Sequence, residues 1–227
     1  EHHDLGCLGA AFHKKAMKRK MEILKQMGVN ALRLAHNMPA PEVMELADRM
    51  GILIVSEAFD MWISEKNPYD YARFFKDWYQ RDLANWIKRD RNHPSILMWS
   101  IGNEVLEQWS HADATELDLQ AANLILNAGH AIDPALLKDT TLSRQSLITR
   151  HLAAIVKRLD TSRVVTAGCN EVNPANHLFR SDALDVLGFN YHEQYLEPFL
   201  RNFPGKKLIV SESTSALMTR GYYEMPS

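Results

Sequence analysis

The sequence predicts an α/β protein, and more closely a (β/α)8 barrel, from three observations. Segments with helical spacing of apolar residues alternate with short, continuously apolar segments along the 227 residues, as in βα units around a parallel sheet. Two of the apolar segments end on a glutamate, Glu104 and Glu212. No glycine-rich phosphate loop follows any predicted strand, and this disfavours the alternative, an open doubly wound sheet.

The first half of the chain contains three predicted helices and three predicted strands. In chain order they are the helix 13–27, the strand 30–36, the helix 41–50, the strand 52–59, the helix 71–91 and the strand 96–104. Gly28 and Gly51 follow the first two helices and end them, and Pro41 lies in the first turn of the second. Four aromatic side chains of the third helix are expected to pack on the barrel: Phe74, Phe75, Trp78 and Trp86.

The second half adds three helices and three strands. They are the helices 113–127 and 146–159, the strands 164–169 and 186–191, the helix 196–202 and the strand 208–211. Six strands in this order fit an eight-stranded TIM barrel that lacks most of strand 1 and all of strand 8. We therefore expect residues 1–227 to form a single, partial barrel domain of a longer protein.

Composition argues against several classes of partner. The 26 lysines and arginines against 28 aspartates and glutamates leave none of the basic excess that a nucleic-acid partner requires. No apolar run approaches the roughly 20 residues of a membrane span, so no membrane contact is predicted. Cys7 and Cys169 are too few for a disulfide framework, and each is expected to be a small buried hydrophobic residue.

The two strand-end glutamates are the strongest functional candidates. An apolar segment beginning near Ile96 stops at Gly-Asn-Glu104, and a second, beginning at Leu208, stops at Ser-Glu212. One such glutamate is often just a solvated loop residue or a helix cap, but two at the carboxyl ends of barrel strands lie where barrel active sites lie. Paired carboxylates about 5–5.5 Å apart are what a retaining glycosidase needs, one as acid and one as nucleophile.

Polar residues also lie at the carboxyl ends of other predicted strands. They are Arg33, His36 and Asn37, then Glu57 and Asp60, then Asn190, Tyr191 and His192. Taken alone, His36 is better explained as a core or capping residue and Trp62 as core packing. The shared polarity of one barrel end is harder to explain by stability alone. His2-His3-Asp4 lacks a partner motif at ligand spacing, so no metal site is predicted there.

Six short motifs together resemble a known family. They are HHDLG at 2–6, RLAHN at 33–37, SEAFDMW at 56–62, DRNHPS at 90–95, WSIGNE at 99–104 and VSE at 210–212. With these motifs the chain resembles the catalytic barrel of glycoside hydrolase family 2, and within it the bacterial β-galactosidase branch. The motifs span almost the whole chain, and the run from NHPS to GNE is highly specific.

The resemblance implies a retaining, exo-acting β-glycosidase, most closely a β-galactosidase, with Glu104 as general acid/base and Glu212 as nucleophile. It implies that Asn103 binds the 2-hydroxyl of the sugar and that Tyr191 donates to Glu212. Four further residues are placed around the cleaved sugar: His2, Arg33, His36 and Asp60. A carbohydrate is thus the expected partner, and accessory β-sandwich domains, with any homo-oligomer contacts they make, are expected outside this chain.

The chain departs from the family pattern at two positions that do not touch the glutamates. Met38 stands where Pro is frequent, and Ser56 where Asp is frequent. Some members bind Mg²⁺ through a Glu-x-His after the third strand. Here that stretch begins at Asp60 and reads DMWI, so neither a metal nor another cofactor is predicted.

Three other functions stay open at this point. The first is a β-glucuronidase or β-mannosidase of the same family. The second is an endo-glycanase from a related barrel family, against which the RLAHN and HHD motifs argue. The third is a non-catalytic carbohydrate-binding barrel, which the loss of either glutamate would favour, although both are present.

Overall fold

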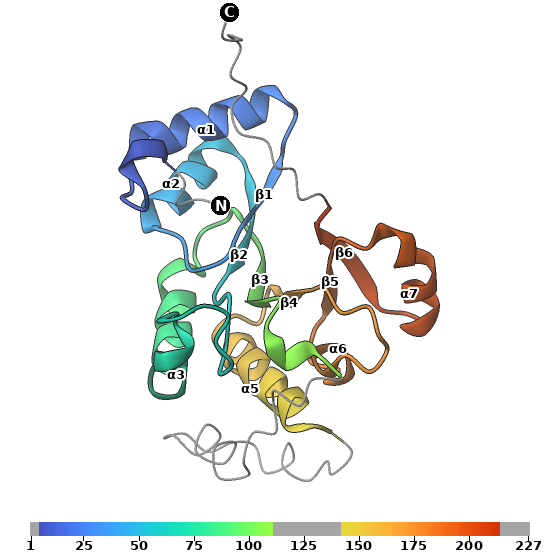
Figure 1. Cartoon of the computed structure of the whole chain (residues 1–227). Helices are drawn as coiled ribbons and strands as arrows, with labels where there is room; N and C mark the ends of the chain where they lie inside the picture. The colour runs from blue at the N-terminus through green and yellow to red at the C-terminus, as the bar shows by residue number, and fades with distance from the viewer. Residues whose placement is uncertain (1–4, 111–141, 214–227) are drawn as a thin grey trace, which may run out of the picture.

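A computed structural model of the protein describes residues 5–110 and 142–213 (Figure 1). Six parallel strands form one sheet in chain order: β1 (Ala31–Leu34), β2 (Leu53–Glu57), β3 (Ile96–Asn103), β4 (Val164–Cys169), β5 (Val186–Asn190) and β6 (Lys207–Glu212). Strands that add in one direction curve into a barrel wall, and these six form a half-barrel. The predicted fold, a partial (β/α)8 barrel, is confirmed.

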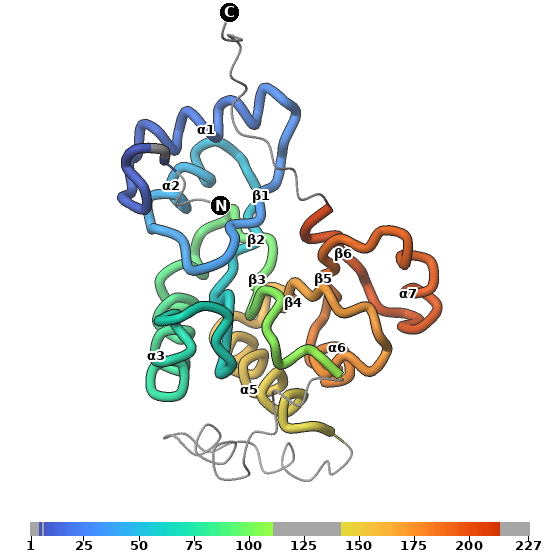
Figure 2. The backbone as a smooth tube through the Cα atoms, viewed as in Figure 1, coloured from blue at the N-terminus to red at the C-terminus, as the bar shows by residue number. Residues whose placement is uncertain are grey.

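The helices follow one another around the sheet, as the ribbon and the backbone tube show (Figures 1 and 2). They are α1 (Lys14–Gln26), α2 (Pro41–Met50), α3 (Ala72–Asp90), α5 (Arg144–Leu159), α6 (His177–Arg180) and α7 (Leu196–Asn202). Single 3-10 turns are η1 (Gly6–Leu8), η2 (Leu106–Gln108) and η5 (Glu193–Tyr195). In the described residues no helix is long and apolar enough to cross a membrane.

Most predicted helices lie within two residues of the observed ones, with two exceptions. The predicted helix 113–127 lies outside the described residues. The one-turn helix α6 was not predicted, because four residues are too few to show helical periodicity. Its only local signal is Asn176, whose side-chain oxygen accepts hydrogen bonds from the backbone of Leu178 and Phe179.

The prediction for the aromatic residues of α3 is half right. Phe75 and Trp86 are buried, but Phe74 and Trp78 are 48% and 38% exposed. The buried positions recur every three or four residues along α3, so the helix buries one stripe and Phe74 and Trp78 lie off it. On the exposed side, the guanidinium of Arg81 lies 3.4 Å from the centre of the Trp78 ring.

The cysteine prediction also holds for one residue only. Cys169, at the end of β4, is fully buried, whereas Cys7 is exposed, so it is not the small buried hydrophobic residue that was expected. Both are free thiols. Cys7 lies in η1, a short turn before α1.

Two β-bulges lie directly before the glutamate-bearing strand ends. On β3 the register slips between Ser100 and Asn103, and on β6 the extra residue is Ser211, because Phe189 pairs with Val210 and Asn190 with Glu212. Side chains alternate along a strand, so an extra residue changes which side chains face the barrel axis. The bulges thereby set the direction of the last residues of both strands.

The close approach of β4 and β5 generates a prediction about stability. A β-carbon at Gly188 would lie 2.2 Å from the carbonyl oxygen of Ala167, so the strands would have to separate. We expect Gly188→Ala to cost about 3 kcal/mol or more of the free energy of unfolding. At Gly205 a β-carbon meets nothing within 4 Å, so Gly205→Ala should cost only about 1 kcal/mol for its left-handed φ of 78°. Chemical denaturation of the full-length protein measures both, and equal losses would contradict the close approach.

Candidate active site

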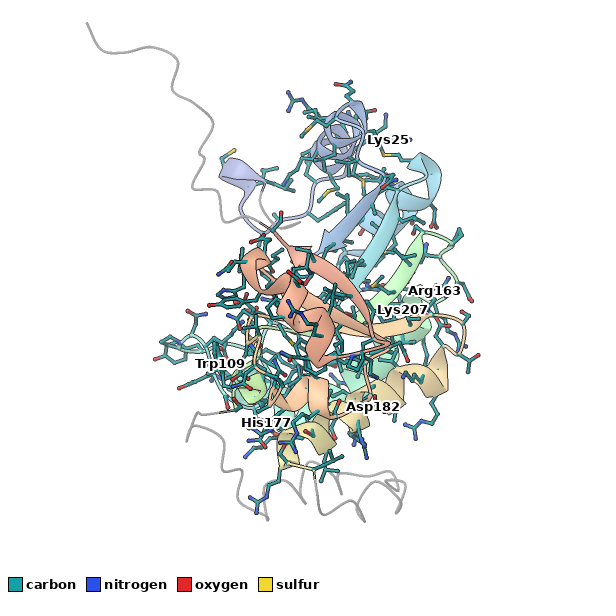
Figure 3. The ribbon with its side chains drawn as sticks, turned by 90° about the vertical axis from the view of Figure 1, so that its right-hand side faces the viewer. Lys25, Trp109, Arg163, His177, Asp182 and Lys207 are labelled. Atoms are coloured by element: carbon teal, nitrogen blue, oxygen red, sulfur yellow. The ribbon has the colours of Figure 1, made fainter. Side chains whose placement is uncertain are left out.

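The polar strand ends gather on one side of the half-barrel. Figure 3 shows Arg163 and Lys207, at the amino ends of β4 and β6, across the molecule from Trp109, which follows the carboxyl end of β3. Parallel strands bring their carboxyl ends to a common rim, and the predicted site residues within the described part of the chain lie there.

Arg33 is the centre of this rim. Its guanidinium forms a two-pronged pair with Glu57, with Nη2–Oε2 at 2.8 Å and Nε–Oε2 at 3.2 Å. Its Nη1 donates to Glu212 Oε1 at 2.5 Å, and its Nη2 donates to Asn103 Oδ1 at 2.7 Å. Burial disfavours the charged guanidinium, but the two carboxylates outweigh it and raise the pKa of Arg33. Arg33 thus ties the ends of β2, β3 and β6 to β1.

Glu57 has a fully buried side chain, and each of its partners is a donor. Besides Arg33, Ser100 Oγ donates to its Oε2 at 2.7 Å, and His36 Nδ1 lies 3.3 Å from its Oε1. Burial lowers the pKa of His36, but the hydrogen bond and negative charge of Glu57 more than offset this and raise it. From the sequence, Glu57 is one of the polar strand-end residues, but no function is predicted for it. A carboxylate inside an apolar strand was nevertheless a signal that a buried cation must face it.

Glu212 is held as a carboxylate by two donors. The hydroxyl of Tyr191 donates to Oε2, and Arg33 donates to Oε1. Burial raises the pKa of Glu212, but these two hydrogen bonds and the charge of Arg33 outweigh it, so the pKa lies below its usual value. The same hydrogen bond is the main reason that the pKa of Tyr191 rises to about 12.

Glu104 has a different environment. Neutral groups hold its side chain, and its backbone is strained. Its φ of 42° is left-handed, which non-glycine residues rarely adopt. Its backbone N–H donates to the Gly168 carbonyl at 2.7 Å, and its Oε1 accepts from Asn190 Nδ2 at 3.0 Å. Asn190 also donates to Asn103 Oδ1 at 3.1 Å, so an unbroken chain of hydrogen bonds joins Glu104, through the asparagines and Arg33, to Glu212.

Asn103 uses both ends of its amide. Its Oδ1 accepts from Arg33, and its Nδ2 donates to Asp60 Oδ1 at 2.9 Å. Lys66 completes the arrangement, since its ammonium contacts Asp60 Oδ1 at 2.8 Å and the Asn103 carbonyl at 3.0 Å. Within the described residues the second hydrogen of the Asn103 amide has no acceptor, so it can donate to a ligand hydroxyl. Lys66 lies in a loop without regular pattern, and no sequence signal identified it.

Gly168 provides the space for this cluster. A β-carbon there would lie 2.8 Å from Arg33 Nη2 and 3.2 Å from the side-chain oxygens of Asn103 and Asn190. Beside the cluster, a cavity of about 850 Å³ opens between the loops after β1 and β2 and the helix α3, and His36 and Asp60 line it. Such a volume is typical of small-molecule sites.

The structure brings together all but one of the predicted site residues. The cluster contains Arg33, His36, Asp60, Asn103, Glu104, Tyr191 and Glu212. The remaining residue, His2, lies outside the described residues. Within residues 5–110 and 142–213, no group of three or more His, Cys, Asp or Glu side chains is placed to hold a metal ion.

Comparison with known sequences gives the class of this barrel. Residues 1–121 match the model of the glycosyl hydrolases family 2 TIM barrel domain. The chain is 58% identical over 226 residues to a β-galactosidase of Bacteroides ovatus, a match that covers 100% of this chain and 26% of that protein. It is 31% identical over 224 residues to a putative β-glucuronidase of Formosa agariphila, a match that covers 98% of this chain and 17% of that protein.

Solved structures agree with the sequence matches. A glycosyl hydrolase family 2 member from Bacteroides cellulosilyticus superposes with a TM-score of 0.73 at 37% identity, covering 94% of this chain and 23% of that one. A β-glycosidase from Bacteroides vulgatus gives 0.67 at 33% identity, covering 92% and 22%. The chain belongs to glycosyl hydrolase family 2, as a part of its TIM barrel domain. It spans about a quarter or less of the length of these relatives.

Proposed function

We propose that the full-length protein is a retaining, exo-acting β-glycosidase that removes terminal β-linked galactose. The observation that carries this proposal is the contrast between the two rim glutamates. Glu212 faces a guanidinium and a phenol, whereas Glu104 accepts from an amide and makes no ion pair among the described residues. The 58% identity to a β-galactosidase supports the choice of sugar.

In this mechanism Glu104 gives its proton to the glycosidic oxygen while Glu212 attacks the anomeric carbon. The bond to the leaving group breaks through an oxocarbenium-like transition state, and a covalent glycosyl-enzyme forms on Glu212. Glu104, now ionised, removes a proton from water, which attacks the same carbon and frees Glu212. The two displacements together retain the configuration of the sugar.

Arg33 and Tyr191 would hold Glu212 ionised and aimed for attack. An attacking carboxylate must be unprotonated at the working pH, and the lowered pKa of Glu212 supports this role. The remaining amide hydrogen of Asn103 would donate to the 2-hydroxyl of the sugar. His36 and Asp60 would bind other hydroxyls, from the side where the cavity opens.

The full-length protein should hydrolyse aryl β-galactosides faster than the matching glucuronides and mannosides.

The two glutamates are expected to respond differently to removal in the full-length protein. Glu212→Ala removes the nucleophile, so hydrolysis of every substrate should fall by several orders of magnitude. Glu104→Ala removes the proton donor, so an activated aryl β-galactoside should still react in the first step. The glycosyl-enzyme should then accumulate, because no base activates water.

Added azide separates the two roles. Because azide needs no general base, it should restore turnover of Glu104→Ala and give the β-galactosyl azide. With Glu212→Ala it attacks directly and should give the α-azide. The anomeric configuration of each product is read by NMR. The opposite pair of anomers would require that the acid/base and nucleophile assignments be exchanged.

Tyr191→Phe is expected to move the acidic limb of the pH profile. Burial raises the pKa of Glu212 and the hydrogen bond from the phenol lowers it, so the pKa rises when that bond is lost. Activity requires ionised Glu212, so kcat/KM should begin to fall at a higher pH in the variant than in the wild type. Tyr195→Phe is the matched control, because no hydrogen bond of the Tyr195 hydroxyl occurs in the described residues. An acidic limb that stays in place would show that Tyr191 does not act through Glu212.

A further inference from the structure

The short turn η2 directly after Glu104 carries two adjacent side chains that reach neighbouring loops. The first, Glu107, has no exposed surface. Its Oε1 accepts from the backbone N–H groups of Ile63 at 2.9 Å and Ser64 at 2.8 Å, both in the loop after β2. Glu107 thereby fastens the segment after Glu104 to the strand on one side.

Gln108 makes the matching contact on the other side. It is also fully buried, and its Oε1 accepts from the backbone N–H groups of Asn170 at 2.9 Å and Glu171 at 3.0 Å, in the loop after β4. The loop after β4 also bonds back to the segment after Glu104. The Glu171 carboxylate accepts from the backbone N–H of Ser110 at 3.1 Å and from the Ser110 hydroxyl at 2.6 Å. The segment between Glu104 and Ser110 is therefore fixed to β2 and to β4 at once.

Packing alone does not explain these residues. Burial raises the pKa of the Glu107 carboxyl, and its Oε2 has no partner among the described residues, an arrangement that lowers stability. An apolar side chain would fill the same space, but it would leave the N–H groups of Ile63 and Ser64 without their acceptor, so hydrogen bonding to this loop, and not packing, accounts for the carboxylate. The left-handed backbone of Glu104 is also strained, and strain of this kind persists only where the surroundings enforce it.

We propose that Glu107 and Gln108 are positioning residues that hold the Glu104 carboxyl where proton transfer to the leaving oxygen requires it. The proposal rests on the acid/base role proposed for Glu104. Their hydrogen-bond partners are backbone groups of the neighbouring loops and not residues of the cluster around Arg33, so they act through the backbone that carries Glu104. A displacement of about 1 Å at such a group can cost about 100-fold in rate.

The effect must depend on the leaving group. A poor leaving group needs the proton from Glu104, whereas a very good one departs without it. A misplaced acid therefore slows the first kind of substrate and spares the second. A general loss of folded protein would instead lower both rates by the same factor, so the dependence on the leaving group separates positioning from stability.

The experiment measures kcat/KM of the full-length protein on aryl β-galactosides of graded leaving-group pKa. Glu107→Leu and Gln108→Met remove the acceptors and should lose roughly 10- to 100-fold on the poorest leaving groups and little on the best. Glu107→Gln keeps an acceptor oxygen for both N–H groups and should stay close to the wild type. Gln80→Met is the matched control, because Gln80 donates to the Tyr79 hydroxyl within α3, away from the loops that Glu107 and Gln108 contact, and should leave the dependence unchanged.

Glu104→Ala provides the reference slope. If it shows no steeper dependence on the leaving group than the wild type, the acid/base assignment fails. Suppose instead that kcat/KM of Glu104→Ala depends steeply on the leaving group. The positioning role is then overturned if the Glu107 and Gln108 variants keep the wild-type slope or lose activity equally on all substrates. Should the apolar variants not fold, Gln108→Asn gives the same comparison, because its shorter side chain withdraws the acceptor from Asn170 and Glu171.

Discussion

The buried guanidinium of Arg33 is the interaction on which the rim depends. Glu57 and Glu212 are both negative and both face it, so without the cation between them two carboxylates would share a poorly hydrated space. Glu57 has no exposed surface and holds Arg33 through its Nε and Nη2 atoms, which leaves Nη1 for Glu212. The same cation orients the Asn103 amide, so one side chain from β1 sets the geometry of three other strand ends.

The fold makes this convergence possible, and small local features complete it. Parallel strands deliver their last residues to one rim, but only the bulges before Asn103 and Glu212 turn those residues toward the cluster. Gly168 leaves the guanidinium the space that any side chain would take. The backbone of Glu104 is left-handed, and its carboxyl, the proposed acid, faces the amide of Asn190. The carboxyl of Glu212, the proposed nucleophile, instead faces the cation of Arg33.

Short-range sequence patterns were enough to predict the strands and the rim. Apolar runs located all six strands, and the glutamates after two of them marked the rim. Features that depend on three-dimensional pairing were out of reach. The register slips at Ser100 and Ser211 leave no mark in composition, and Glu107 and Gln108 resemble ordinary polar residues of a loop. The exposed Phe74 shows the same limit, because its position on the helix and not its aromatic character decides which side it faces.

The central claim is that Glu212, held ionised by Arg33 and Tyr191, is the group that bonds to the sugar. A 2-deoxy-2-fluoro-β-galactoside with a good leaving group tests it most directly, because the fluorine slows both displacements and the leaving group restores only the first. Mass spectrometry of a digest of the treated full-length protein locates the sugar. The account predicts an adduct on the peptide that contains Glu212, and an adduct on Glu104 or on any other residue would contradict it.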